Sequence, residues 1–153
     1  MNLDDHVCQC NESCIISSKN SSFIVYGAKT SYRLNNNGKF VSKYIVDDCV
    51  LKQFNEHKKC DYLFIVQKSR TKKDKKDGYF IELKGGDVPK AINQLLNSIN
   101  HLRNNINGEM LGRIVCSKFP KAPDTLSSNS YIKLRKVLKG NIIIKSTQFF
   151  ENA

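Results

Sequence analysis

The segment CDYLFIVQKSRTKKDKKDGYFIELKGG, residues 60–86, decides the fold of this chain. Two apolar runs, 60–66 and 78–86, flank a polar loop, and short apolar runs bounded by turn residues are typical of β-strands. We expect them to form adjacent strands of one hairpin. Asp61 begins the first strand and Glu82 lies near the end of the second, so the hairpin brings both carboxylates to one end of a sheet.

The acidic residues of this hairpin have a lysine beside them. Glu82 and Lys84 are two residues apart, so alternation along a strand places both side chains on the same face. Two carboxylates offer the oxygen ligands that Mg²⁺ prefers, and a neighbouring ammonium can orient or deprotonate a water molecule. The pattern predicts a phosphodiester hydrolase site. The alternative is structural: Lys84 pairs with Glu82, and Asp61 is a strand-end residue near solvent or paired with a lysine.

The rest of the chain predicts one α/β domain over residues 1–153. Its strands are expected at 23–27, 39–51, 112–119 and 141–150, with a hairpin at the Asn-Asn-Gly turn of 33–40. Helices are expected at 87–105, where Asp87 can cap the first turn, and at 131–140. The unit strand, helix, strand around 87–105 favours parallel neighbours. Residues 1–21 are expected to form an N-terminal arm or a short helix.

Asp61 together with Glu82, Leu83 and Lys84 resembles the core of the PD-(D/E)XK nuclease superfamily. The sequence that follows is similar to members with a glutamine on the next helix, here Gln94. The resemblance implies a restriction-endonuclease-like fold, with a central mixed β-sheet flanked by helices. It also implies Mg²⁺-dependent cleavage of nucleic acid, with Mn²⁺ able to substitute. The implied metal ligands are Asp61, Glu82 and the backbone carbonyl of Leu83, and the implied catalytic residues are Asp61, Glu82, Lys84 and Gln94.

The chain departs from that pattern in two ways. Cys60 precedes Asp61 where the family motif has a proline. The additional upstream acid is also unsettled: Glu12 is the choice if residues 10–18 form a helix against the sheet. The other available acids are Asp47, Asp48 and Glu56. For Gln94, a solvent-facing helix residue is an equally weighted alternative.

The charge of the chain fits a polyanionic partner and a merely basic composition equally well, and the Asp61, Glu82 and Lys84 cluster makes nucleic acid the favoured partner. There are 25 basic and 14 acidic residues, a formal net charge of +11. The candidate nucleic-acid contacts are basic residues late in the chain: Lys118, Lys133, Arg135 and Lys136, with Arg113 and Lys139 as further candidates. DNA is the favoured substrate. The alternatives are an RNase of the same fold, or a catalytically silent binding or interaction subunit of a defence or repair complex.

The remaining features predict a cytoplasmic protein. No run of apolar residues is long enough to span a membrane, and the first ten residues do not resemble a secretory signal. The six cysteines are therefore expected to be thiols, and Cys8, Cys10 and Cys14 match a zinc site poorly. Whether the protein acts as a homodimer stays open at this stage.

Overall fold

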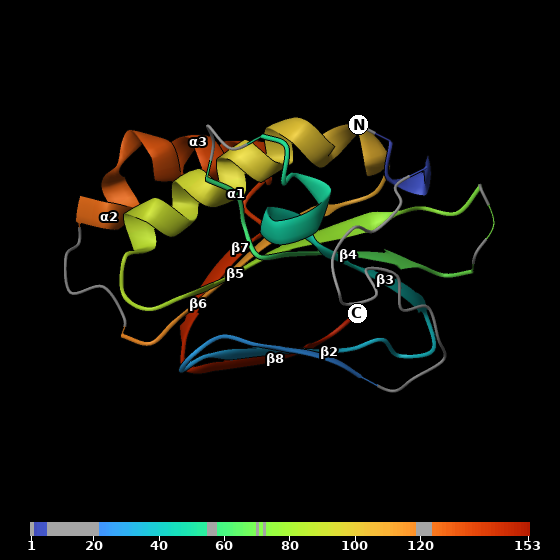
Figure 1. Ribbon diagram of the computed structural model, residues 1–153, viewed down its shortest axis with the longest axis horizontal. Coiled ribbons are helices and arrows are strands. Elements are labelled where there is room, and N and C mark those ends of the chain that lie inside the picture. Colours follow the sequence, from blue (N-terminus) through green and yellow to red (C-terminus); the bar gives the residue numbers. More distant parts are fainter. Residues whose placement is uncertain (1, 6–21, 55–57, 70, 72, 119–123) are drawn as a thin grey trace.

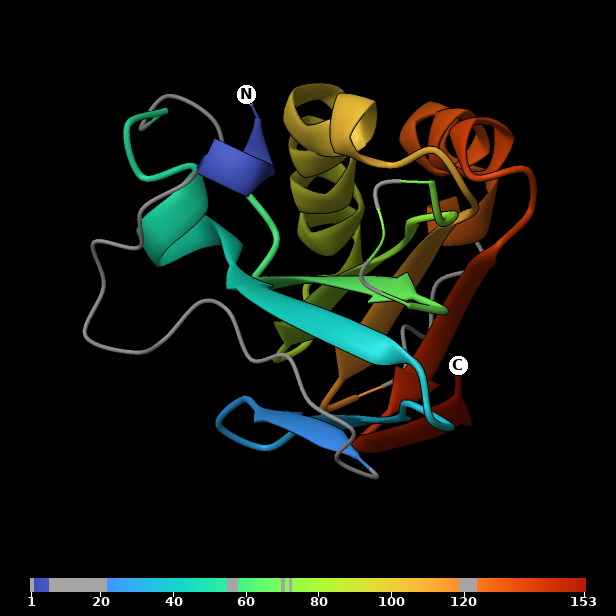
Figure 2. The same cartoon turned by 90° about the vertical axis from the view of Figure 1, so that its right-hand side faces the viewer.

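A five-stranded sheet at the centre of the molecule lies between a layer of helices and a second, smaller sheet (Figure 1 and Figure 2). The structure is a computed structural model that describes residues 2–5, 22–54, 58–69, 71, 73–118 and 124–153. The fold is a single mixed α/β domain, as expected. Within the described residues, no helix is long and apolar enough to cross a bilayer.

The central sheet is mixed and has the strand order β3-β4-β5-β6-β7. Its strands are β3 (Phe40–Ile45), β4 (Tyr62–Gln67), β5 (Asp77–Lys84), β6 (Met110–Cys116) and β7 (Ile142–Ser146). The first three strands pair antiparallel, whereas β6 pairs parallel with both β5 and β7. The predicted hairpin is therefore confirmed, and so is the parallel arrangement on either side of the helix that follows it.

Helices cover one face of this sheet (Figure 1). The longest is α1 (Val88–Leu102), which begins directly after β5 because the side chain of Asp87 accepts a hydrogen bond from the Lys90 backbone amide at 3.0 Å. Helix α3 (Asn129–Val137) packs beside it. The short helical segments are η1 (Leu3–Asp5), the π-helical turn η2 (Val46–Val50), η3 (Arg103–Asn105) and α2 (Asp124–Ser127).

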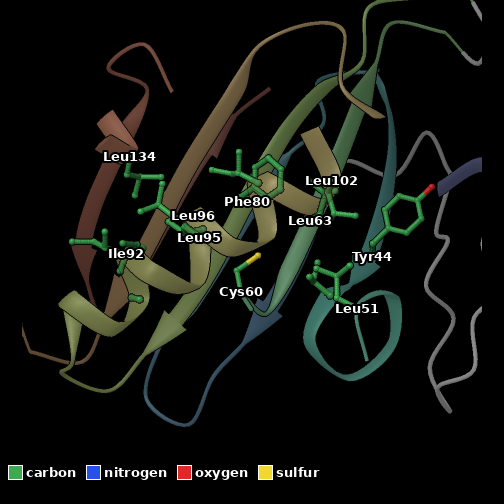
Figure 3. Packing of buried hydrophobic residues seen from close by; sticks show 14 of the residues in the cluster. Tyr44, Leu51, Cys60, Leu63, Phe80, Ile92, Leu95, Leu96, Leu102 and Leu134 are labelled. Carbon is green, nitrogen blue, oxygen red and sulfur yellow. The ribbon is translucent and has the colours of Figure 1, made fainter. Parts of the chain in front are cut away.

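The main hydrophobic core lies between α1 and the central sheet. Figure 3 shows Ile92 and Leu95 of α1 in the same cluster as Leu63 of β4 and Phe80 of β5. All four side chains are fully buried. They show which way the two strands face: odd-numbered residues of β4 and even-numbered residues of β5 point toward the helices.

The smaller sheet covers the opposite face. It consists of β1 (Phe23–Tyr26), β2 (Ser31–Asn35) and β8 (Gln148–Asn152) in the order β1-β2-β8. Strands β1 and β2 pair antiparallel, and β2 pairs parallel with β8. Aromatic side chains fill the space between the two sheets, with ring centroids 5.9 Å apart for Tyr32 and Phe64. This apolar layer attaches the small sheet to the central one.

A buried ion pair crosses the same layer. Arg113 of β6 donates from Nε and Nη2 to the two carboxylate oxygens of Glu151 in β8, at 2.7 and 3.0 Å. The hydroxyl of Tyr32 donates to Glu151 at 2.6 Å. Burial, together with this carboxylate, raises the pKa of Tyr32 above its ordinary range. Since Arg113 is only 4% exposed, the pair links the two sheets inside the molecule.

Three expectations about the strands were wrong. The Asn-Asn-Gly turn is present, with positive φ at Asn37 and Gly38, but it connects strands of different sheets instead of forming a hairpin. The strand expected over 39–51 ends at Ile45, because the chain turns there into η2. The strand expected over 141–150 is divided at Thr147, whose φ of 66° ends β7 and directs β8 into the other sheet.

The expected layers were correct only in part. The central sheet is mixed, but helices flank one face and the smaller sheet covers the other. The reason lies in the two separated segments 23–35 and 148–152, whose buried aromatic and aliphatic side chains form the second core. The N-terminal arm expected over 1–21 lies outside the described residues apart from Asn2 to Asp5.

Candidate functional site

Asp61 and Glu82 lie opposite each other at one end of the β4–β5 hairpin. The antiparallel register pairs Tyr62 with Ile81, so the next pair of opposite residues is Asp61 and Glu82. One oxygen of Asp61 accepts a hydrogen bond from the Leu83 backbone amide at 2.9 Å. One oxygen of Glu82 accepts from the Asp61 backbone amide at 3.1 Å. The predicted proximity of the two carboxylates is confirmed, and each is held by a backbone amide of the other strand.

Glu82 is buried and Asp61 is partly buried. Glu82 is 1% exposed, and burial followed by the nearby Asp61 carboxylate raises its pKa to about 8, although Lys84 opposes the shift. The pKa of Asp61 is also raised, mainly by burial, while its hydrogen bond from Leu83 opposes this. A buried carboxylate is costly unless positive charge compensates it. Glu82 therefore keeps its proton near neutral pH in the metal-free protein, and a bound cation would favour its ionised form.

Lys84 lies on the same face of β5 as Glu82. Its Nζ is 3.6 Å from Oε1 of Glu82, and its side chain is 21% exposed, compared with 2% for that of Glu82. The ammonium is therefore in contact with the buried carboxylate while still reaching solvent. This arrangement fits both predicted roles, the ion-pair partner and the group that acts on a water molecule.

Lys84 also lines a pocket of about 490 Å³ that the sequence did not predict. Five lysines surround this pocket, with two aspartates and one glutamine: Lys52, Lys58, Lys59, Lys84, Lys90, Asp47, Asp48 and Gln94. The pKa of Lys58 lies below its ordinary value, chiefly because the amino group of Lys90 is within hydrogen-bonding reach and repels its charge. Crowded ammonium groups attract an anion such as a phosphate.

Gln94 is buried, so the solvent-facing alternative was wrong. It is 7% exposed, and its Nε2 donates to the Lys59 carbonyl at 3.0 Å. Its Oε1 has no hydrogen-bond partner among the described residues, although the side chain borders the lysine-lined pocket. One turn along α1, Ser98 accepts a hydrogen bond from the Cys60 backbone amide at 2.8 Å. Helix α1 thereby holds the segment that leads into Asp61.

The basic residues predicted to bind nucleic acid are spread over two regions. Lys118 is exposed just after β6, and its backbone amide donates to the Gly85 carbonyl at 3.3 Å, next to the Lys84 end of β5. Lys133, Arg135 and Lys136 are exposed on α3, on a separate part of the surface. Arg113 is not available for phosphate contacts, since its guanidinium is buried against Glu151.

A third acidic ligand is missing from the described part of the chain. There, no group of three or more histidine, cysteine, aspartate or glutamate side chains is close enough to hold a metal ion. Asp47 lines the neighbouring pocket but pairs with Lys59 at 3.6 Å. Glu12 lies outside the described residues. The Asp61–Glu82 pair still has the oxygen donors that suit Mg²⁺, which commonly binds one or two carboxylates and keeps several waters.

Comparisons with known proteins found no relative. No family model, no curated protein and no solved structure matches the chain. What the site can do therefore follows from its own geometry.

Proposed function

We propose that this protein is a divalent-metal-dependent nuclease that hydrolyses phosphodiester bonds, with DNA as the favoured substrate. One observation supports this most strongly. Asp61, Glu82 and Lys84 lie together at one end of the β4–β5 hairpin, and Lys84 also lines the lysine-rich pocket. Two carboxylates and an ammonium beside a pocket suited to phosphate are the groups that phosphodiester hydrolysis needs. The restriction-endonuclease-like arrangement of the core belongs to the same proposal.

Asp61 and Glu82 are proposed to hold Mg²⁺ or Mn²⁺. When bound, such an ion polarises a phosphate and lowers the pKa of a coordinated water. The acid pair offers carboxylate oxygens in a site with little solvent, and a bound cation would favour the ionised form of Glu82, whose pKa is about 8 in the metal-free protein. The Leu83 backbone carbonyl is proposed as a further ligand. The backbone amide of the same residue already donates a hydrogen bond to Asp61.

Lys84 is proposed to position the attacking water and to take part in moving its proton. Its ammonium lies between the Glu82 carboxylate and the pocket, where a scissile phosphate would enter. The lysines of the pocket would hold the phosphates on either side. The free acceptor of Gln94 can receive a hydrogen bond from a water or from a substrate group.

Cleavage assays test this proposal directly. Supercoiled, linear and single-stranded DNA and RNA are incubated with the protein in Mg²⁺, in Mn²⁺ and in EDTA. We expect cleavage in either metal and none in EDTA, and loss of cleavage in Asp61→Asn and Glu82→Gln. Lys84→Ala should keep nucleic-acid binding and lose at least ~100-fold in rate. Lys68→Ala removes the same charge at the opposite end of the hairpin and serves as the control.

A binding module without cleavage is the second candidate. The absence of a third acidic ligand from the described residues favours it. Such a protein would retain nucleic acid in every buffer but leave all four substrates intact, and Mn²⁺ would not stabilise it. An RNase of the same fold would cut only the RNA. Each outcome in the same assay thus identifies a different candidate.

A further inference from the structure

The outer face of the small sheet exposes two aromatic rings. Tyr26 at the end of β1 is 70% exposed, and Phe150 of β8 is 55% exposed. Ile24 of β1 is 38% exposed on the same face. Three exposed apolar side chains thus share one face of a small sheet, and exposed apolar groups gathered on one face can mark an interaction site.

A cationic side chain lies between these apolar groups. The register places Ile24 opposite Arg33 and Arg33 opposite Phe150, so the three form a row across the sheet. The Arg33 guanidinium carbon is 5.8 Å from the centroid of the Phe150 ring. The guanidinium therefore lies over the Phe150 ring, and this planar pair can be extended by stacking with a further flat ring.

The remaining outward positions of the three strands carry no carboxylate. By strand alternation they are the polar residues Ser31, Asn35, Gln148 and Asn152. The acid of β8, Glu151, points the other way and is held by Arg113. The face thus combines aromatic rings, one guanidinium and amide side chains, without acidic groups that would repel a polyanion.

We propose that this face binds single-stranded nucleic acid by stacking unpaired bases on Tyr26 and Phe150. Every base has a π-face, so aromatic platforms accept bases of any sequence, and a neighbouring arginine adds cation–π and phosphate contacts. The amide side chains can bond to base edges. The formal net charge of +11 draws the strand to the protein. A paired duplex keeps its bases stacked on one another and cannot use the platform.

A second copy of this chain fits the face less well. In a two-fold dimer the same patch faces itself, so Arg33 would approach its own counterpart with no carboxylate from the three strands to pair with. The Arg33 guanidinium donates to the Ser22 hydroxyl at 3.4 Å, and an apolar protein partner would bury its other donors without acceptors, which is costly. Nucleic acid satisfies all of these groups.

The platform lies at the same end of the fold as the acid pair. The turn after Tyr26 packs against β5, because a Cβ atom added at Gly27 would be 3.1 Å from Cβ of Leu83. Leu83 lies between Glu82 and Lys84 in the sequence. Leu83 faces the small sheet, whereas Glu82 and Lys84 face the helices, so the platform and the proposed cleavage site lie on opposite sides of the central sheet. Binding to the platform does not depend on the proposed nuclease function.

A tryptophan reporter tests the proposal. The chain has no tryptophan, so Phe150→Trp introduces a single fluorophore into the platform. All measurements use EDTA, which prevents metal-dependent cleavage. We expect quenching by a ~15-nucleotide oligothymidine, which matches the site sizes of stacking proteins. A duplex of equal length should quench much less, and heparin, which has charge but no bases, should not quench. Equal quenching by heparin would overturn the proposal.

Affinity measurements supply an independent readout. Fluorescence anisotropy of the labelled oligonucleotide should show that Tyr26→Ala and Phe150→Ala each weaken binding by about 5-fold to 100-fold. Tyr26→Leu should bind the oligonucleotide nearly as weakly as Tyr26→Ala, since leucine keeps apolar bulk but lacks the aromatic ring. Ile132→Ala is the matched control, because Ile132 of α3 is also 55% exposed. Circular dichroism verifies that each variant is folded.

Two results would refute the platform. One is unchanged oligonucleotide affinity in both alanine variants. The other is a dimer in sedimentation experiments that both variants disrupt, which would assign the face to a second copy. The nuclease proposal is tested separately, through cleavage in Mg²⁺ by the wild type and by Glu82→Gln. Either proposal can therefore fail while the other stands.

Discussion

Replacing Glu82 by glutamine should stabilise the metal-free protein at alkaline pH. The substitution keeps the shape of the side chain and an oxygen that can accept from the Asp61 amide, but removes a buried charge. Burial and Asp61 raise the Glu82 pKa from 4.5 to about 8. At ~1.4 kcal/mol per pKa unit, ionising this group costs the folded state about 2–5 kcal/mol after relaxation of its surroundings.

The direction of the pH effect follows from proton binding. Between pH 4.5 and about 8 the folded state keeps the Glu82 proton, whereas the unfolded state loses it. The unfolding free energy of the wild type should therefore fall as pH rises through this window, because the unfolded state binds fewer protons. The fall should be smaller in Glu82→Gln. The two proteins should be similar near pH 4 and differ most near pH 9.

Urea denaturation followed by far-UV circular dichroism measures this difference. Samples contain EDTA and span pH 4 to pH 9. Glu109→Gln, which removes an exposed carboxylate, controls for the change in net charge. In parallel samples without EDTA, free Mn²⁺ at ~100 times its dissociation constant should stabilise the wild type by about 2.7 kcal/mol and leave Glu82→Gln unchanged.

A lower unfolding free energy of Glu82→Gln than of the wild type at pH 9 would contradict this prediction. If Glu82→Gln is less stable than the wild type at pH 9, the carboxylate contributes more through its ion pair with Lys84 than its burial costs. Glu82 would then be a structural residue. A lack of stabilisation by Mn²⁺ would remove the proposed metal site independently of the pH result.

Two single substitutions and two sets of three test other parts of the molecule. Arg113→Met should lower the unfolding free energy by up to about 3–5 kcal/mol in urea denaturation, since it leaves the partly buried Glu151 carboxylate with Tyr32 but without a compensating positive charge; an unchanged value would contradict a stabilising ion pair. Gln94→Leu should cost about 1–3 kcal/mol in the same assay, because the Lys59 carbonyl loses its donor; a neutral result would mean that water replaces the amide. Changing the lysines of the pocket to glutamine should raise KM for cleavage. Changing the basic residues of α3 to glutamine should leave KM unchanged and flatten the log–log salt dependence of duplex binding by about 0.9 per lost contact. If only the α3 set raises KM, the substrate binds on α3. The two sets are Lys52, Lys58 and Lys90, and Lys133, Arg135 and Lys136.

Local sequence patterns predicted the acid pair because its geometry is local. Alternation in a strand places Glu82 and Lys84 on one face, and a hairpin needs only a short loop to bring Asp61 opposite. The helix cap at Asp87 and the apolar spacing of α1 also depend only on residues that are close together in the sequence. The lysine-lined pocket could not be predicted, since it joins three separated segments of the chain.

The buried position of Gln94 had a weaker signal. It precedes Ser98 by one helical turn, and both side chains contact the segment before β4. Helical spacing shows that they share a face, but only the packing of α1 decides what that face meets. The small sheet was missed for a similar reason. The turn at Asn37 and Gly38 reveals a change of direction, whereas strand partners depend on residues far away in the sequence.

The pairing of β2 with β8 has a consequence for the order of folding. Strand β2 lies early in the described chain and its parallel partner is the last strand, so this ladder can close only after the intervening segments are in place. Long-range pairing carries a large loop-closure entropy and slows folding. The hairpin β4–β5, by contrast, is joined by a short loop and can form early. We therefore expect the small sheet to form last and to open first. Native-state hydrogen exchange should show its amides exchanging as a separate cooperative unit ahead of those in β4, β5 and β6.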